Sequence, residues 1–219
     1  MEAPQRYHLE PVIKEKKIPY LFPHEGIFTK KDSRYLFTSY PRYIDEIKII
    51  IKYLTKTRGI KKIGILHADN SYGYLFRDKL NESSNRMNYV VTRIQSVKHM
   101  LPDDLKSEML LLKNSGPDAI IMALYPAQAQ KCLEAKAEID WTTVTMVSSG
   151  PLTDEQYLNV QEGSGEGIIG LCYYPDPNKS REKGIIEFRE SMEKYYPGTL
   201  LNRCYVSVPI SNLVSQFLS

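Results

Sequence analysis

The stretch Lys61–Phe76, KKIGILHADNSYGYLF, decides the fold of this 219-residue chain. After two lysines, Ile63–His67 form a mostly apolar run, which is typical of a buried parallel strand. A polar turn follows at 68–73 with several side chains able to cap a helix, and an amphipathic helix comes next. Strand, turn and helix in this order make half of a βαβ unit, and ligands of open α/β sheets bind at the carboxyl ends of the strands. The turn at 68–73 is therefore the first candidate for function.

The same alternation of strand and helix continues toward the carboxyl terminus. The apolar runs predict strands at 62–67, 89–96, 119–124, 143–147 and 167–173. The intervening segments predict helices at 71–83, 102–114, 126–138 and 153–160, and a helix at 43–56 precedes the first of these strands. Strands separated by helices of this length predict an α/β fold, with a parallel sheet covered by helices on both faces.

Two proline-marked breaks, at 40–41 and 174–175, bracket this five-stranded unit, which we place at 41–175. The flanking pieces, 1–40 and 176–219, have few strands. They carry predicted helices at 5–17, 183–196 and 205–218, with short strands at 20–22 and 35–38. We expect these pieces either to pack together as part of another lobe or to pack against the five-stranded unit.

Composition excludes several function classes. Hydrophobic residues make up 42% of the chain and charged residues 25%, as in an ordinary globular protein. A net charge of +3 with scattered basic residues gives no reason to expect nucleic acid as a partner. No run reaches the roughly 20 apolar residues of a membrane span, and the polar start of the sequence predicts no signal peptide.

No catalytic or metal-binding set is recognisable among the reactive residues. The four histidines do not cluster, and His67 at a strand end is best interpreted as a satisfied edge residue. The three cysteines, an odd number, exclude a fully paired framework, and their spacing suggests no metal. Cys132 is expected to be a small core residue on a helix, while a bridge between two of the three cysteines stays open. The sequence predicts no metal and no cofactor.

Polar turns that follow successive strands do converge on one edge of the predicted sheet. These turns are 68–73, 124–127 and 148–150, where exposed helix N-termini can take hydrogen-bond acceptors or a carboxylate. Tyr72, Tyr125 and Ser149 are the side chains best placed to face a small ligand. The alternative interpretation is that they are helix caps and rim tyrosines.

The order of these motifs resembles the extracytoplasmic solute-binding proteins of the branched-chain amino acid transport family, with the type I periplasmic binding fold. The matching segments are IPYLFPHEG at 18–26, YLFTSYP at 35–41, IGILHADNSYG at 63–73, LLLKNSGPDAIIMALYPAQAQ at 110–130, MVSSGPLTDEQYL at 146–158 and GEGIIGLCYYPDP at 165–177. The resemblance implies two α/β lobes that close on a small ligand by a hinge. It makes 41–175 most of the second lobe and 1–40 with 176–219 fragments of the first, so that the chain is expected to be truncated at both ends.

The resemblance also assigns ligand contacts in the first lobe. Residues His24, Glu25 and Gly26 fall on the loop that binds the ligand carboxylate in the family, through a backbone N–H and a hydroxyl. Gly26 occupies the hydroxyl position, so that contact is expected to be lost.

In the second lobe the resemblance makes Tyr72 and Tyr125 the aromatic residues that close over the ligand. Ser149 falls where amino acid binders place an acid that pairs with the ammonium group. A buried charged hydrogen bond contributes about 1.5–3 kcal/mol. Because Ser149 replaces the acid, an ordinary α-amino acid is disfavoured as the ligand unless Glu25 supplies the negative charge. A small carboxylate, aromatic acid, amide or similar polar ligand is favoured.

The function implied is non-enzymatic capture of a small polar organic ligand, amino acid-like or a carboxylate, in the periplasm or outside the cell. The expected partner is an ABC permease, the expected state is a monomer, and no nucleic acid is involved. A ligand-sensing receptor domain of the same fold is the alternative, and an α/β enzyme is less favoured because no nucleophile–base pair is evident.

Overall fold

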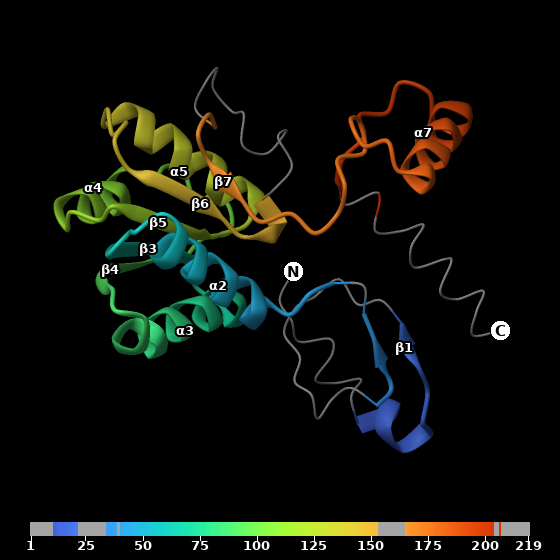
Figure 1. The fold of residues 1–219 in the computed structure, drawn as a ribbon, viewed down its shortest axis with the longest axis horizontal. Helices are drawn as coiled ribbons and strands as arrows, with labels where there is room; N and C mark the ends of the chain where they lie inside the picture. The colour runs from blue at the N-terminus through green and yellow to red at the C-terminus, as the bar shows by residue number, and fades with distance from the viewer. Residues whose placement is uncertain (1–10, 22–33, 39, 153–164, 204–205, 207–219) are drawn as a thin grey trace. The chain divides into compact units, whose positions relative to one another are not determined.

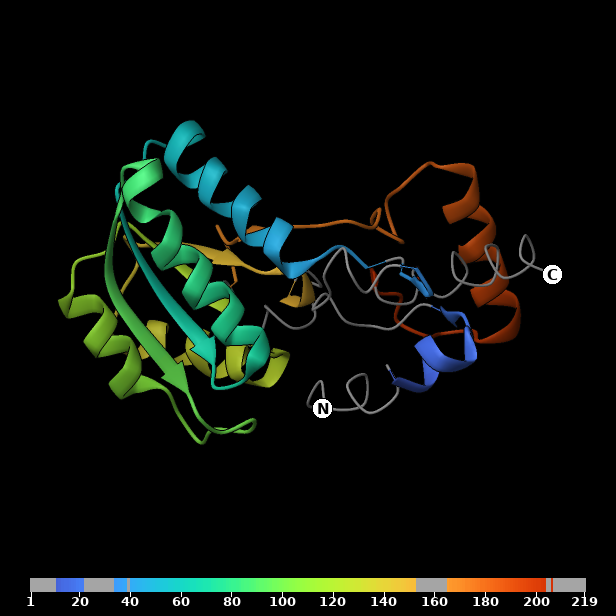
Figure 2. The ribbon, with the colours of Figure 1, turned by 90° about the horizontal axis from the view of Figure 1, so that it is seen from below.

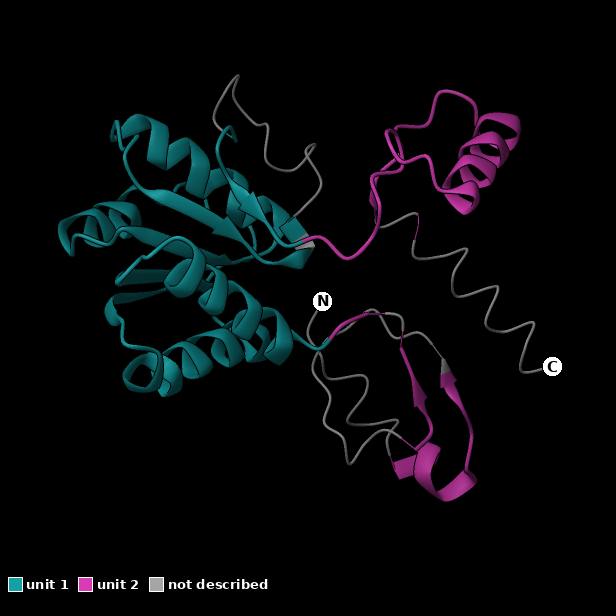
Figure 3. Ribbon diagram, in the orientation of Figure 1, with its two compact units in different colours: residues 1–3, 42–171 teal, residues 4–41, 172–219 magenta. Residues whose placement is uncertain are grey.

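The structure is a computed structural model that describes residues 11–21, 34–38, 40–152, 165–203 and 206. The chain divides into two compact units, coloured separately in Figure 3. Unit 1 comprises residues 1–3 and 42–171, and unit 2 comprises residues 4–41 and 172–219. The assignment of the predicted segments to a second and a first lobe stays a prediction.

The described strands of unit 1 form one five-stranded sheet in the order β4-β3-β5-β6-β7 (Figure 1). Every neighbouring pair of these strands is parallel, which confirms the predicted α/β fold. Their bounds are β3 Lys62–Ala68, β4 Val90–Val97, β5 Ala119–Ala123, β6 Thr145–Ser148 and β7 Ile169–Gly170.

Helices cover both faces of this sheet, as predicted. In Figures 1 and 2, α2 and α3 lie on one face, and α4 and α5 lie on the other. The helices are α2 Tyr43–Lys52, which the π-helical turn η2 Tyr53–Thr57 continues, α3 Ser71–Met87, α4 Lys106–Asn114 and α5 Pro126–Glu138. A short 3-10 turn, η3 Gly150–Leu152, follows β6.

The strands bury side chains on both faces because helices remove both from water. In β3, Leu66 joins an apolar cluster with residues of α4 and α5, whereas Ile63 and Ile65 alternate to the opposite face. On that face α2 and α3 supply fully buried side chains such as Ile47 and Phe76. The continuous apolar character of β3 in the sequence is thus explained by burial from two sides.

The turn between β3 and α3 is built around Asn70 and Gly73. The Asn70 side chain caps the helix, because its Oδ1 accepts a hydrogen bond from the Gly73 N–H at 3.2 Å. Gly73 packs so closely on the end of β3 that a Cβ there would lie 1.9 Å from the carbonyl oxygen of Ala68. A glycine is therefore required where α3 approaches the strand.

Several element bounds in unit 1 differ from the prediction; α3, for example, continues to Met87 and not 83. Helix α4 begins at Lys106 and not at 102, because Asp104 Oδ1 accepts from the Lys106 N–H and Leu105 has non-helical backbone angles. Strand β7 is short, since its pairing with β6 extends over Ile169–Gly170 alone. The helices predicted at 153–160 and 205–218 lie outside the described residues.

The described part of unit 2 contains fewer helices and strands than that of unit 1. Strands β1 Tyr20–Leu21 and β2 Leu36–Phe37 pair in parallel, and helix α7 spans Lys183–Tyr195. Arg189 of α7 donates from Nη1 to the carbonyl oxygens of Pro177 and Ser180, at 3.0 and 2.9 Å, which holds the preceding loop against the helix.

Candidate functional site

The structure brings together three predicted site residues at the carboxyl edge of the unit 1 sheet. Tyr72 lies in the first turn of α3, Tyr125 directly precedes α5, and Ser149 directly follows β6. The Tyr72 hydroxyl donates to Ser149 Oγ at 2.5 Å, and the rings of Tyr72 and Tyr125 lie 5.6 Å apart between centroids. Turns that follow three different strands thus form one network.

Aromatic packing also holds Tyr72 in place. Its ring lies edge-on to Phe76 at a centroid distance of 5.2 Å and 4.7 Å from the ring of Tyr43 on α2. Only 3% of Tyr72 is exposed, and Ser149 is fully buried. Tyr72 therefore contributes both to the stability of unit 1 and to the polar geometry at its edge.

Asn70 is a member of this network that sequence reasoning treated only as part of the capping turn. While its Oδ1 caps α3, its Nδ2 donates to the Tyr125 hydroxyl at 3.3 Å. The backbone N–H of Tyr125 donates to Gln128 Oε1 at 3.1 Å, and Gln128 Nε2 donates to the His99 carbonyl oxygen at 2.9 Å. The side-chain amide of Asn70 thus links the starts of α3 and α5.

Glu46 of α2 is a second residue that the sequence analysis missed at this edge. Its carboxylate is buried, with 1% of the residue exposed, and Oε2 accepts from the Gly150 N–H at 3.1 Å. The signal in the sequence is its position four residues before Ile50, because that spacing puts both on the buried stripe of α2.

His67, the histidine at the end of β3, is buried with its Nδ1 2.8 Å from the Ala68 carbonyl oxygen. Burial lowers its pKa below the usual value, which favours the neutral imidazole. The nearby Asp69 accepts from the Tyr74 hydroxyl at 2.8 Å and is an exposed residue outside the buried network. These positions support the interpretation of His67 as a satisfied edge residue.

The first-lobe residues predicted for the site, His24, Glu25 and Gly26, lie outside the described residues. In the described part of the chain, no group of three or more His, Cys, Asp or Glu side chains is arranged to hold a metal ion.

Cys132 is a buried core residue, as predicted, and burial raises the pKa of its thiol to about 12. Among the helices that the structure describes, none is both long and apolar enough to cross a membrane.

Comparison with known proteins gives one matching family. A family described as "Periplasmic binding protein" matches residues 1–210. Comparison with curated proteins gives no match.

Solved structures show the same fold at low sequence identity. A possible leucine/isoleucine/valine-binding protein from Rhodopirellula baltica superposes with a TM-score of 0.80 at 17% identity, over 97% of this chain and 58% of that one. A branched-chain amino acid ABC transporter protein from Thermus thermophilus with bound valine gives 0.78 at 12% identity, over 94% and 52%. A solute-binding protein of an ABC transporter from Rhodopseudomonas palustris in complex with 4-hydroxybenzoate gives 0.78 at 16% identity, over 98% and 58%. The chain thus spans a little over half the length of these solved chains.

Proposed function

Since the chain belongs to the periplasmic binding protein family, we propose that it captures a small polar organic solute outside the cytoplasm for an ABC importer. In this proposal unit 1 is the second lobe of a solute-binding protein and unit 2 is part of the first. The protein binds its solute without chemical conversion, and the permease is its partner.

The observation that carries the proposal is the hydrogen bond from the Tyr72 hydroxyl to Ser149 Oγ, beside the ring of Tyr125. Three turns that are distant in sequence bring hydroxyl groups and aromatic rings together at the carboxyl edge of a parallel sheet, where ligands of open α/β folds bind. Helices α3 and α5 also begin there, and the positive ends of their dipoles favour a carboxylate or another acceptor.

The side chains of this network favour an aromatic or other small carboxylate over an α-amino acid. Tyr72, Tyr125 and Ser149 offer rings and neutral hydroxyls, which suit a planar polar ligand. An α-ammonium group buried beside Ser149 would lack a carboxylate partner from that position, and an unpaired buried charge is costly. Among the similar solved structures, the complex with 4-hydroxybenzoate supplies a ligand of the favoured class.

Calorimetric titration of the protein with 4-hydroxybenzoate and with valine tests this proposal. We expect 4-hydroxybenzoate to bind more tightly and to raise the melting temperature progressively as its free concentration exceeds its Kd. Native mass spectrometry of protein purified without added ligand gives an independent measurement, because a retained solute identifies the class directly. Tighter binding of valine would refute the ligand class, and conversion of a bound solute to product would refute the non-enzymatic function.

A further inference from the structure

Glu46 is the one buried acidic side chain among the residues that the structure describes, with 1% of it exposed. Burial of a carboxylate carries a large desolvation penalty, which must be offset by hydrogen bonds or favourable fields. The described residues supply two such contributions. Glu46 lies in the first turn of α2, where the helix dipole favours a negative charge, and its Oε2 accepts from the Gly150 N–H at 3.1 Å.

The hydrogen bond from Gly150 fixes the turn that carries Ser149. On one side of the turn, the Ser149 N–H donates to the Met122 carbonyl of β5 at 3.2 Å. On the other side, the next amide along the chain is held by Glu46. Because both consecutive N–H groups are bonded to different elements, the backbone that carries the Ser149 side chain is fixed on both sides.

We infer that Glu46 is a positioning residue of the ligand site: from α2 it holds the Gly150 amide, and thereby sets Ser149 Oγ where Tyr72 donates to it. This inference rests on the proposed function for its effect on binding, but the geometry is independent of any ligand. It differs from the family resemblance, which assigns a role to position 149 and none to position 46. Since the chain enters unit 1 at Arg42, the first turn of α2 links that point of entry to the end of β6.

Two substitutions of Glu46 separate positioning from bulk stability. Glu46→Gln keeps an oxygen acceptor of the same reach, whereas Glu46→Leu keeps the volume and removes the acceptor. Replacement of a buried charge by an apolar side chain is often neutral or stabilising for a fold. Glu46→Leu is therefore expected to remain folded while it loses the contact. Asp45→Asn is the matched control, because the neighbouring Asp45 pairs with Arg42 and Lys48 outside the buried network.

The first measurement is amide hydrogen exchange followed by NMR, which needs no ligand. In Glu46→Leu the Gly150 amide is expected to exchange at least about tenfold faster, from the loss of a hydrogen bond to a charged group. The Ser149 amide, bonded to Met122, serves as the internal reference and keeps its protection. Glu46→Gln and Asp45→Asn are expected to keep both amides protected.

The second measurement is the affinity for 4-hydroxybenzoate. Glu46→Leu is expected to weaken binding about tenfold or more, and Glu46→Gln to stay within about threefold of the unsubstituted protein. Unchanged Gly150 exchange in Glu46→Leu would overturn the inference, as would faster exchange with unchanged affinity. If the unsubstituted protein binds no 4-hydroxybenzoate, the proposed ligand class fails. The inference is then judged by exchange alone, with Gly150 protection lost in Glu46→Leu and kept in Glu46→Gln supporting it.

Discussion

Tyr72→Phe is the substitution that isolates the polar contact at the centre of the site. The change deletes one hydroxyl and leaves the ring, so the contacts with Phe76, Tyr43 and Tyr125 persist. Loss of a donor to a fully buried acceptor costs about 1–3 kcal/mol, which here concerns Ser149 Oγ. For a unit of this size we expect a fall in melting temperature of roughly 4–11 °C. Tyr72→Ala is less informative, because truncation of a buried aromatic side chain costs about 3–5 kcal/mol and threatens the fold itself.

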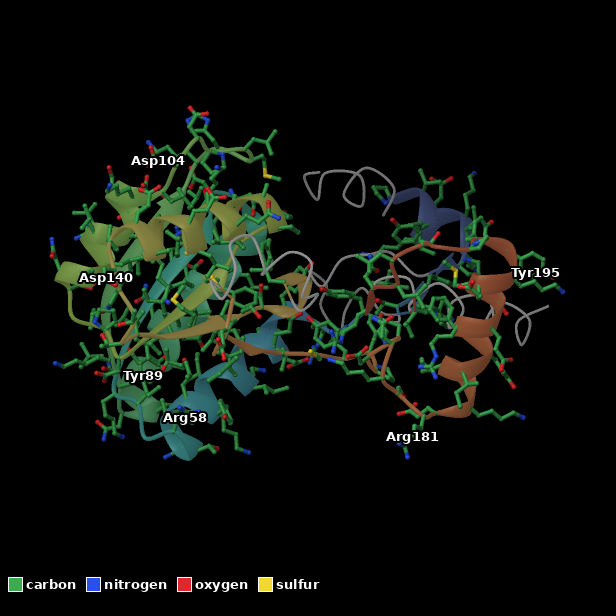
Figure 4. All side chains as sticks on the ribbon, turned by 90° about the horizontal axis from the view of Figure 1, so that it is seen from above. Arg58, Tyr89, Asp104, Asp140, Arg181 and Tyr195 are labelled. Atoms are coloured by element: carbon green, nitrogen blue, oxygen red, sulfur yellow. The ribbon has the colours of Figure 1, made fainter. Side chains whose placement is uncertain are left out.

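Tyr89→Phe is the control for loss of a buried hydroxyl in general. The Tyr89 hydroxyl donates to the Leu80 carbonyl at 2.5 Å and lies 2.8 Å from Ser83 Oγ. Tyr89, labelled in Figure 4, directly precedes β4, so it lies at the opposite end of the parallel strands from the turns of the candidate site. We expect a similar loss of stability in both variants, with weaker 4-hydroxybenzoate binding in Tyr72→Phe alone.

A double-mutant cycle with Ser149→Ala gives the decisive number. If Tyr72 and Ser149 act as a pair, the double variant will be about as stable as Ser149→Ala alone, with a coupling energy of about 1 kcal/mol or more. Chemical denaturation of the four proteins measures this coupling. Additive losses of stability would show that the 2.5 Å contact contributes no net stabilisation, and the reasoning from its geometry would then be wrong.

Three further predictions concern the surroundings of the site. Gly73→Ala is expected to lower the unfolding free energy by about 2 kcal/mol or more, because a Cβ there meets a backbone carbonyl, whereas Gly184→Ala in open space on α7 is expected to be neutral or stabilising in thermal unfolding. Because the pKa of His67 is lowered in the fold, the unfolded chain takes up the proton first as the pH falls below about 6.5, so stability falls there; denaturation at pH 7.5 and 5 should show a smaller loss in His67→Gln, and an equal loss in both proteins would contradict this. Peptide mapping after brief thiol alkylation is expected to find Cys172 modified and Cys132 intact, since Cys132 is buried with a pKa of about 12, and early labelling of Cys132 would contradict its burial.

The fold of unit 1 could be predicted from the sequence because its signals are local. The apolar run of β3, the capping Asn70 and the periodic stripe of α2 each determine one element, and their alternation determines a parallel sheet. Element boundaries depended on finer geometry. Helix α4 starts at Lys106 because Asp104, and not Pro102, provides the hydrogen bond at its start.

The candidate site could be predicted only in part. Tyr72, Tyr125 and Ser149 follow strands of one parallel sheet, so topology alone brings them to one edge. The partner of each side chain could not be derived in this way, because it depends on strand order and helix packing. In the sequence Glu46 is an ordinary acidic residue of a first helical turn. Only the packing of α2 reveals its contact with Gly150, 104 residues away.

The buried polar side chains of unit 1 are concentrated at the edge of the sheet where we propose that the ligand binds. Two of the described buried polar residues of unit 1, Thr55 and Ser83, simply donate to carbonyls of their own helices. The others lie at the ends of β3 and β6 or in the first turns of α2 and α5: Glu46, His67, Gln128, Ser148 and Ser149. Burial of polar groups costs free energy that an apolar core of the same volume would avoid. Their concentration where the strands end supports the proposal that a polar solute binds at this edge, because an apolar core gains nothing from buried polar groups.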